Sequence, residues 1–168
     1  RWTTVTGVQT CALPIWDTSH ALSSALRAEG MEAEIFPESN DETLEIGRKF
    51  TCGKECYPCI ITTGDMVRIV KSPGFKPAES IFFMPSTMGP CRFGQYNRLQ
   101  RIILDSLGYD DVPIVSPNQV NSLHKELKVC GKSVFRNTWR GVVAIDLLGD
   151  MSRRIRPYEV DRGETDMV

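Results

Sequence analysis

The sequence has no excess of charge of one sign and no long hydrophobic run. Its 168 residues include 20 basic and 21 acidic side chains, which give a formal net charge of −1 at pH 7. This balance excludes the strongly basic surface that proteins binding nucleic acids or anionic membranes usually present. No apolar stretch approaches the ~20 residues that a membrane-spanning helix needs. We therefore expect neither a nucleic acid nor a membrane among its partners.

Histidine is scarce, and several common motifs are missing. The two histidines, His20 and His124, lie far apart in the sequence and offer no metal-binding pair. There is no G-x4-GK[ST] loop and no G-x-G-x-x-G segment after a strand, which excludes nucleotide sites of these two kinds. The first residues also lack the charged start, apolar stretch and small-residue cleavage site of a secretory signal. We expect a cytoplasmic protein.

Cysteine, in contrast, is present in an informative arrangement. The segment TCGKECYPC places Cys52, Cys56 and Cys59 in a C-x3-C-x2-C pattern. In a cytoplasmic protein, clustered cysteines more often bind metal or carry out redox chemistry than form structural disulfides. An iron–sulfur cluster needs several thiolates close together, which such short spacings provide locally. Pro58 suits the first turn of a helix, so the helix expected over residues 60–70 directs its positive dipole end toward the sulfurs.

A second cysteine locus follows a buried-strand pattern. The apolar run SIFFMP at residues 80–85 leads to Cys91, after which a helix is expected over residues 92–107. Cys91 therefore lies at a strand-to-helix turn, where open parallel sheets collect their ligands. We predict that this loop and the 52–59 loop meet at one end of the sheet. The predicted ligands of an iron–sulfur cluster are Cys52, Cys56, Cys59 and Cys91.

The thiol pattern leaves other interpretations open. Zinc also binds four cysteines, although structural zinc sites usually combine two C-x2-C knuckles and only one is present here. A C-x3-C-x2-C triplet also occurs in radical enzymes that cleave S-adenosylmethionine, which do not use a distant extra cysteine. A disulfide, or a chance grouping of small buried residues, is a further alternative. Cys130 has no cysteine near it in the sequence and is not expected to be a ligand.

Polar residues near the cysteines are weaker candidates. Thr62 and Thr63, close to the start of the helix after Cys59, suit either anion binding or helix capping. Gln95, Tyr96 and Asn97 follow Cys91 and could surround a cluster. Tyr96 also fits the apolar stripe of its helix, so we expect it to pack in the core.

The remaining pattern alternates helices with short apolar strands. Strands are expected at residues 31–36, 80–85 and 112–116, and helices at 17–29, 39–50, 60–70, 92–107 and 134–151. This alternation predicts an α/β domain of the Rossmann- or flavodoxin-like kind with a mainly parallel sheet, truncated at both ends. The inward-facing residues expected in the last helix are Phe135, Trp139, Val142, Val143 and Leu147.

The two ends of the sequence look cut. Residues 1–16, beginning RWTTVTGVQTCALPI, have no clear helical or strand period and resemble the translation of a sequencing-library adapter. On this interpretation Trp2, Cys11 and Trp16 have no biological meaning, and we exclude the segment from fold and site reasoning. The polar tail RPYEVDRGETDMV does not close a domain. We expect residues 17–168 to be an internal part of a larger protein.

Several segments resemble one known family. These are GKECYPCIITTGDM, FFMPSTMGPCRFGQYNRLQRIILDSLGYDDVPIVSPN, and WRGVVAIDLL with the later RPYEV and GETD. They are similar to the C-terminal part of large activators related to the (R)-2-hydroxyglutaryl-CoA dehydratase activase, the CoA-substrate-specific enzyme activases. The similarity runs from about Asp17 to the end, and GPCRFGQYNR is highly specific. In that family such a region follows ATPase domains and is similar to the dehydratase D-component, which binds iron–sulfur clusters.

The resemblance implies ATP-driven delivery of a low-potential electron through a cluster, expected to be 4Fe–4S, to a 2-hydroxyacyl-CoA dehydratase-like protein. ATP would act only through an ATPase domain absent from this sequence, so the fragment alone is not expected to be catalytic. Expected partners are the dehydratase-like protein, the upstream ATPase domain and a second copy of the chain. The match transfers best to Cys56 within GKEC and Cys91 within GPC. The alternatives are a 2-hydroxyacyl-CoA dehydratase component itself and a structural zinc-binding domain.

Overall fold

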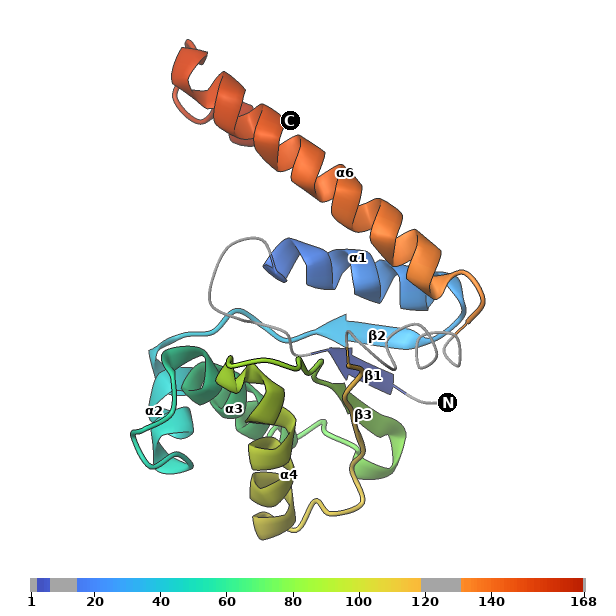
Figure 1. Cartoon of the computed structure of the whole chain (residues 1–168), viewed down its shortest axis with the longest axis vertical. Helices are drawn as coiled ribbons and strands as arrows, with labels where there is room; N and C mark the ends of the chain where they lie inside the picture. Colours follow the sequence, from blue (N-terminus) through green and yellow to red (C-terminus); the bar gives the residue numbers. More distant parts are fainter. Residues whose placement is uncertain (1–2, 7–14, 119–130, 168) are drawn as a thin grey trace.

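A small parallel sheet lies at the centre of the molecule, with helices on both of its faces (Figure 1). The computed structural model describes residues 3–6, 15–118 and 131–167. The sheet has four strands in the order β2-β1-β3-β4. Their bounds are Thr3–Thr6 for β1, Glu32–Ile35 for β2, Ser80–Phe83 for β3 and Ile114–Val115 for β4. The predicted α/β class with a parallel sheet is confirmed, as are the three predicted strands.

The strand β1 comes from the segment in which we expected no regular structure. Thr3 pairs in parallel with Glu32 on one side and with Ser80 on the other, so β1 connects β2 to the rest of the sheet. The sequence TTVT is rich in β-branched residues, which fit a strand whatever the origin of the segment. The attribution of residues 1–16 to an adapter therefore stays a prediction. Trp2 and Cys11, like the side chain of Trp16, lie outside the described part of the chain.

The helices form one layer on each face of the sheet (Figure 1). On one face lie α1 and α6, and on the other lie α2, α3 and α4. Short 3-10 turns precede β3, precede α4 and follow α6. The helices span Ile15–Ala28 (α1), Asp41–Lys49 (α2), Tyr57–Val70 (α3), Tyr96–Ser106 (α4) and Val134–Ile155 (α6). Each of the predicted helices is present, with shifted ends.

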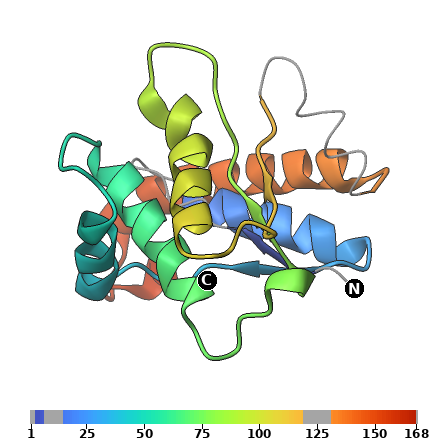
Figure 2. The ribbon, with the colours of Figure 1, turned by 90° about the horizontal axis from the view of Figure 1, so that it is seen from below.

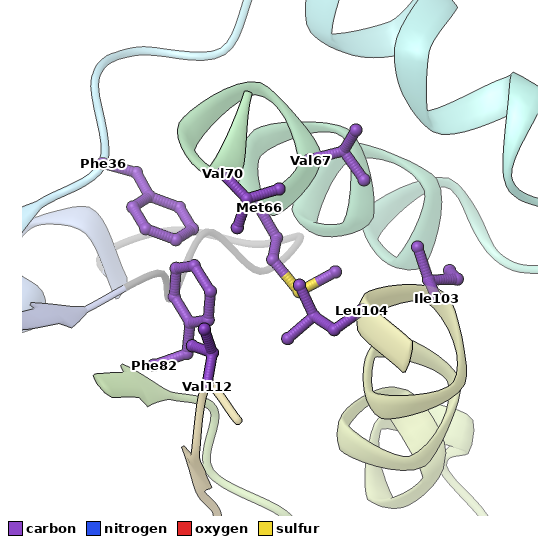
Figure 3. Packing of buried hydrophobic residues seen from close by; sticks show 8 residues of the cluster. All are labelled: Phe36, Met66, Val67, Val70, Phe82, Ile103, Leu104 and Val112. Atoms are coloured by element: carbon purple, nitrogen blue, oxygen red, sulfur yellow. The ribbon is translucent and has the colours of Figure 1, made fainter. Parts of the chain in front are cut away.

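The main hydrophobic core lies between the sheet and the layer of α2, α3 and α4. Phe82 of β3 packs edge-on against Phe36, with ring centroids 5.8 Å apart. The next residue, Phe83, belongs to a second core under α1 and α6, because successive strand residues point to opposite faces. Burial of these side chains fixes α3 and α4 on the same face. Figure 3 shows the main core, formed by Phe36, Met66, Val67, Val70, Phe82, Ile103, Leu104 and Val112.

A close crossing of α2 and α3 fixes the position of the cysteine loop between them. A capping box begins α2, since Asn40 and Thr43 exchange side-chain hydrogen bonds with each other's backbone N–H. A Cβ built on Gly47 would lie 2.0 Å from the carbonyl oxygen of Ile60, and one on Gly64 would lie 2.0 Å from that of Thr43. The two backbones can approach this closely only because both positions are glycine.

The last helix differs from our prediction. Trp139, Val143 and Leu147, which we expected to face inward, are 62%, 51% and 60% exposed. Helix α6 packs against α1 through small residues, because a Cβ on Gly141 would lie 2.7 Å from the Cβ of Ala21. That contact uses a different side of α6 from the apolar stripe, and the helix extends past α1 (Figure 1). In the part of the chain that the structure describes, every helix is too short or too polar to cross a membrane.

Candidate metal centre

Two of the predicted ligands lie in the first turn of α3. Cys56 is the N-cap residue, with extended backbone angles of φ −72° and ψ 151°, and Pro58 follows within the first turn. The backbone N–H of Cys59 donates to the carbonyl of Cys56 at 2.9 Å, which closes the turn. The helix therefore begins three residues earlier than the sequence predicted. This start places the pair, rather than Ile60, at the positive end of the helix dipole.

A cavity of about 280 Å³ opens beside this pair of cysteines. Its walls come from the loop before α3, from α3 itself and from the segment that follows Cys91. Figure 2 shows α3 and α4 next to each other on the same face of the sheet. The lining residues are Lys54, Glu55, Cys56, Cys59, Arg92, Gln95, Tyr96 and Leu99. Residues about forty positions apart in the sequence therefore share one hollow, as a two-loop site requires.

Direct contacts join the two loops. The Sγ of Cys56 lies 2.6 Å from the Oη of Tyr96, and the guanidinium of Arg92 donates to the carbonyl of Lys54 at 2.6 Å. Cys59 and Tyr96 also pack together with Met84, the residue after β3. The site thus lies beyond the carboxyl end of β3, which is where parallel sheets collect ligands.

Burial and nearby negative charge shape the electrostatics of the cavity. Burial raises the pKa of the Cys59 thiol to about 11, and the charges of Cys56 and Glu55 act in the same direction. The nearby Thr63 hydroxyl and the charge of Arg92 oppose this shift. Burial also raises the pKa of the Tyr96 hydroxyl well above its ordinary value, so that Tyr96 stays protonated and can donate to the Cys56 sulfur.

The predicted ligands do not form one compact set. Cys56 is half-buried and Cys59 is buried, and both line the cavity. Cys91 is exposed, but its charge contributes to the shift at Tyr96. Cys52 is exposed and does not line the cavity. Among the described residues, no three cysteine, histidine or acidic side chains are grouped tightly enough to hold a metal ion. Cys130 lies outside the described residues.

The donor set suits an iron–sulfur cluster by its chemistry. Thiolates are soft ligands that select iron–sulfur clusters or zinc over harder metals. Cys56 and Cys59 present two sulfurs to one hollow, and Arg92 and Lys54 bring positive charge to its wall, which complements an anionic cluster. Two of the four predicted ligands, Cys56 and Cys59, therefore share the cavity, whereas the exposed Cys52 and Cys91 are not part of its lining. The four-cysteine cluster stays a prediction.

Tyr96 both packs in the core and lies beside a predicted ligand of the cluster. It is buried at 4% exposure, in line with the apolar stripe, and its hydroxyl contacts a predicted ligand. Its ring packs edge-on against Phe93 at 5.3 Å between centroids. Thr62 donates to the carbonyl of Pro58 inside the helix, so its hydroxyl is used within α3. Sequence reasoning missed the influence of Thr63 on the pKa of Cys59, although the spacing of four residues on a helix was a usable signal.

Comparisons with known proteins found no relative of this chain. No family model, no curated protein and no solved structure matches this chain.

Proposed function

We propose that this chain is the iron–sulfur-binding part of an ATP-dependent activator that delivers low-potential electrons to a 2-hydroxyacyl-CoA dehydratase-type system. The observation that carries the proposal is the shared cavity in which Cys56 and Cys59 of one loop meet Tyr96, which follows Cys91 of the other. The segments GKECYPC and GPCRFGQYNR, whose resemblance suggested this function, are the ones that border the cavity. Electron transfer, rather than catalysis by this chain alone, suits a site built from thiols.

The residues around the cavity have distinct tasks in this proposal. Cys52, Cys56, Cys59 and Cys91 would hold the cluster, which when bound accepts and releases one electron at low potential. Tyr96 orients Cys56 through its hydroxyl, and Arg92 holds the two loops together through the carbonyl of Lys54. The apolar side chains of Met84, Phe93 and Leu99 pack around the cysteine pair and limit the access of water to it. A dry environment of this kind controls the reduction potential.

The strand order supports the finer fold proposal. The order β2-β1-β3-β4, with all pairs parallel, agrees with the first four strands of the flavodoxin-like order 2-1-3-4-5. In such a sheet the ligand lies beyond the carboxyl ends of the strands, and Met84 next to Cys59 is at such an end. We extend the proposal to the partners: an ATPase domain of the activase kind couples ATP hydrolysis to the electron transfer, and a dehydratase-like protein in the cytoplasm receives the electron.

Anaerobic reconstitution with iron and sulfide tests this function. We expect a brown protein that is bleached by oxygen and contains iron and sulfide in similar amounts. Cys56→Ser and Cys91→Ser should each lose most of this iron, whereas Cys130→Ser, the matched control, should keep it. A colourless protein with stoichiometric zinc would instead support the zinc-binding alternative. Full iron content in both ligand variants would contradict the assignment.

A further inference from the structure

The turn Cys56-Tyr57-Pro58-Cys59 has a second chemical capacity besides metal binding. It is a C-x-x-C motif at the start of an α-helix, the arrangement typical of dithiol oxidoreductases. Residues three apart on a helix have Cβ atoms ~5–6 Å apart, and a disulfide needs ~3.5–4.5 Å. Cys56 is the N-cap and has extended rather than helical backbone angles. A rotation at this one residue can therefore close the gap without unwinding α3.

The two thiols differ in access, which gives each a separate role. Cys56 is half-buried and borders the open cavity, so a small disulfide can reach its sulfur. Cys59 also lines the cavity but is only 4% exposed, so an external disulfide reaches its sulfur far less readily. The Tyr96 hydroxyl lies 2.6 Å from the Cys56 sulfur and can donate to it. The difference in access therefore makes Cys56 the attacking sulfur and leaves Cys59 as the internal, resolving thiol.

We propose that Cys56 and Cys59 form a reversible disulfide by exchange with a low-molecular-weight disulfide such as oxidised glutathione. The Cys56 thiolate attacks one sulfur of the small disulfide, which forms a mixed disulfide and releases one small thiol. The Cys59 thiol then loses its proton to solvent and attacks the Cys56 sulfur, which releases the second small thiol. The protein dithiol is oxidised by two electrons, and the small disulfide is reduced to two thiols.

The disulfide also regulates the site, and this consequence rests on the proposed function. A sulfur engaged in the Cys56–Cys59 bond is not a thiolate and cannot bind iron. Oxidised protein therefore takes up no cluster until a thiol reductant opens the bond. Cys52 and Cys91 are both exposed on separate loops. They serve as matched controls, because loss of either thiol leaves the Cys56–Cys59 pair intact.

Mass spectrometry of the metal-free chain tests the exchange directly. The protein is equilibrated anaerobically with oxidised and reduced glutathione, free thiols are alkylated, and the chain is cleaved with trypsin. The peptide from Glu55 to Arg68 contains only these two cysteines. We expect it to appear unalkylated and lighter by two hydrogens, and to become doubly alkylated after dithiothreitol. Cys52→Ser and Cys91→Ser should give the same peptide.

The variant Cys59→Ser separates the two steps. Without the resolving thiol, it should accumulate glutathione on Cys56. Absence of that adduct, or oxidised Cys56 found linked to Cys52 or Cys91, would overturn the inference. Iron uptake by the fully reduced wild-type chain is measured in parallel. If iron and sulfide bind but no Cys56–Cys59 disulfide forms, the switch is wrong and the proposed function stands. If the disulfide forms but the reduced chain binds no cluster, the exchange chemistry stands and the proposed function is wrong.

Discussion

The hydroxyl of Tyr96 is the polar group in closest contact with the cysteine pair. It lies 2.6 Å from the Cys56 sulfur, in a cavity whose other walls include Cys59 and Leu99. Hydrogen bonds to the sulfurs of a cluster stabilise its reduced, more negative state and so raise its reduction potential. One neutral hydrogen bond contributes about 1 kcal/mol, which corresponds to ~40 mV for a one-electron couple.

We therefore predict that Tyr96→Phe keeps the cluster but lowers its potential by tens of millivolts, a magnitude of ~40 mV on this reasoning. The measurement is a redox titration of the reconstituted protein, with iron content determined on the same samples. Tyr109→Phe is the control, because that hydroxyl donates to the carbonyl of Val70 at 2.8 Å, outside the cavity. An unchanged potential in Tyr96→Phe, with full iron content, would show that the contact does not act on the cluster.

Asp65 offers a second test at the residue scale, through pH. Its carboxylate is fully buried in α3 and accepts hydrogen bonds from Ser39 at 2.7 Å and Thr43 at 3.2 Å, with Arg68 at 3.3 Å. Burial dominates and raises the pKa of this carboxyl above the ordinary value of 3.8, although these three partners act in the opposite direction. The folded protein therefore binds the proton more tightly than the unfolded chain does.

The sign of the pH effect follows from this shift. The stabilisation that the protonated carboxyl provides is fully present below pH 3.8 and is lost as the pH rises through the native pKa. Asp65→Asn keeps the shape and cannot titrate. The free energy of unfolding of wild type, relative to Asp65→Asn, should fall between acidic and neutral pH in urea titrations. A difference that grows with pH would mean that the hydrogen bonds, rather than burial, dominate.

At the scale of helices, the crossing of α2 and α3 is the contact that positions the site. We predict that Gly64→Ala destabilises the fold, because the new Cβ would lie 2.0 Å from the carbonyl oxygen of Thr43. Overpacking of this kind costs about 1–3 kcal/mol or more, which exceeds the gain of ~1 kcal/mol in helix propensity. Urea unfolding measures the net effect. Gly74→Ala, with no atom within 4 Å of the new Cβ, should change stability little; equal stability of both variants would contradict the crossing.

The elements that sequence reasoning found are those with local signals. The helix expected over residues 39–50 is α2, and the apolar run at residues 80–85 contains β3. The start of α3 was placed three residues late, although the assignment of Pro58 to the first turn already indicated an earlier start. The exposed stripe of α6 could not be predicted, since an apolar stripe indicates a partner surface without saying which element supplies it. Here α1 covers a different side of that helix.

At the scale of the whole molecule, the sheet depends on a strand that we had set aside. In the described sheet, β1 is the only neighbour of β2, and it also pairs with β3. We predict that a chain beginning at Ile15 is substantially less stable, with an unfolding midpoint at lower urea concentration. Removing residues 159–168 is the control, because that tail follows α6 and its 3-10 turn Glu164–Asp166 packs against that helix. An unchanged midpoint in the shortened chain would mean that β1 is dispensable.

The packing of the whole molecule also decides which parts of the site the sequence could predict. The spacing of Cys56 and Cys59 predicted two neighbouring thiols, because local geometry suffices for residues three apart. The approach of the Cys91 loop required the parallel sheet to bring two distant turns to one end, and only the contacts of Tyr96 and Arg92 reveal it. The exposed position of Cys52 depends on the path of its loop, which no periodic pattern encodes.

X-ray absorption at the iron edge of the anaerobically reconstituted protein tests the central claim most directly. The proposal that thiols of two loops hold one iron–sulfur cluster predicts a first shell of sulfur around iron and a second shell of iron. In Cys91→Ser the iron–iron shell should be lost or strongly reduced. Iron surrounded by oxygen and nitrogen, with no neighbouring iron in the wild-type protein, would contradict the account.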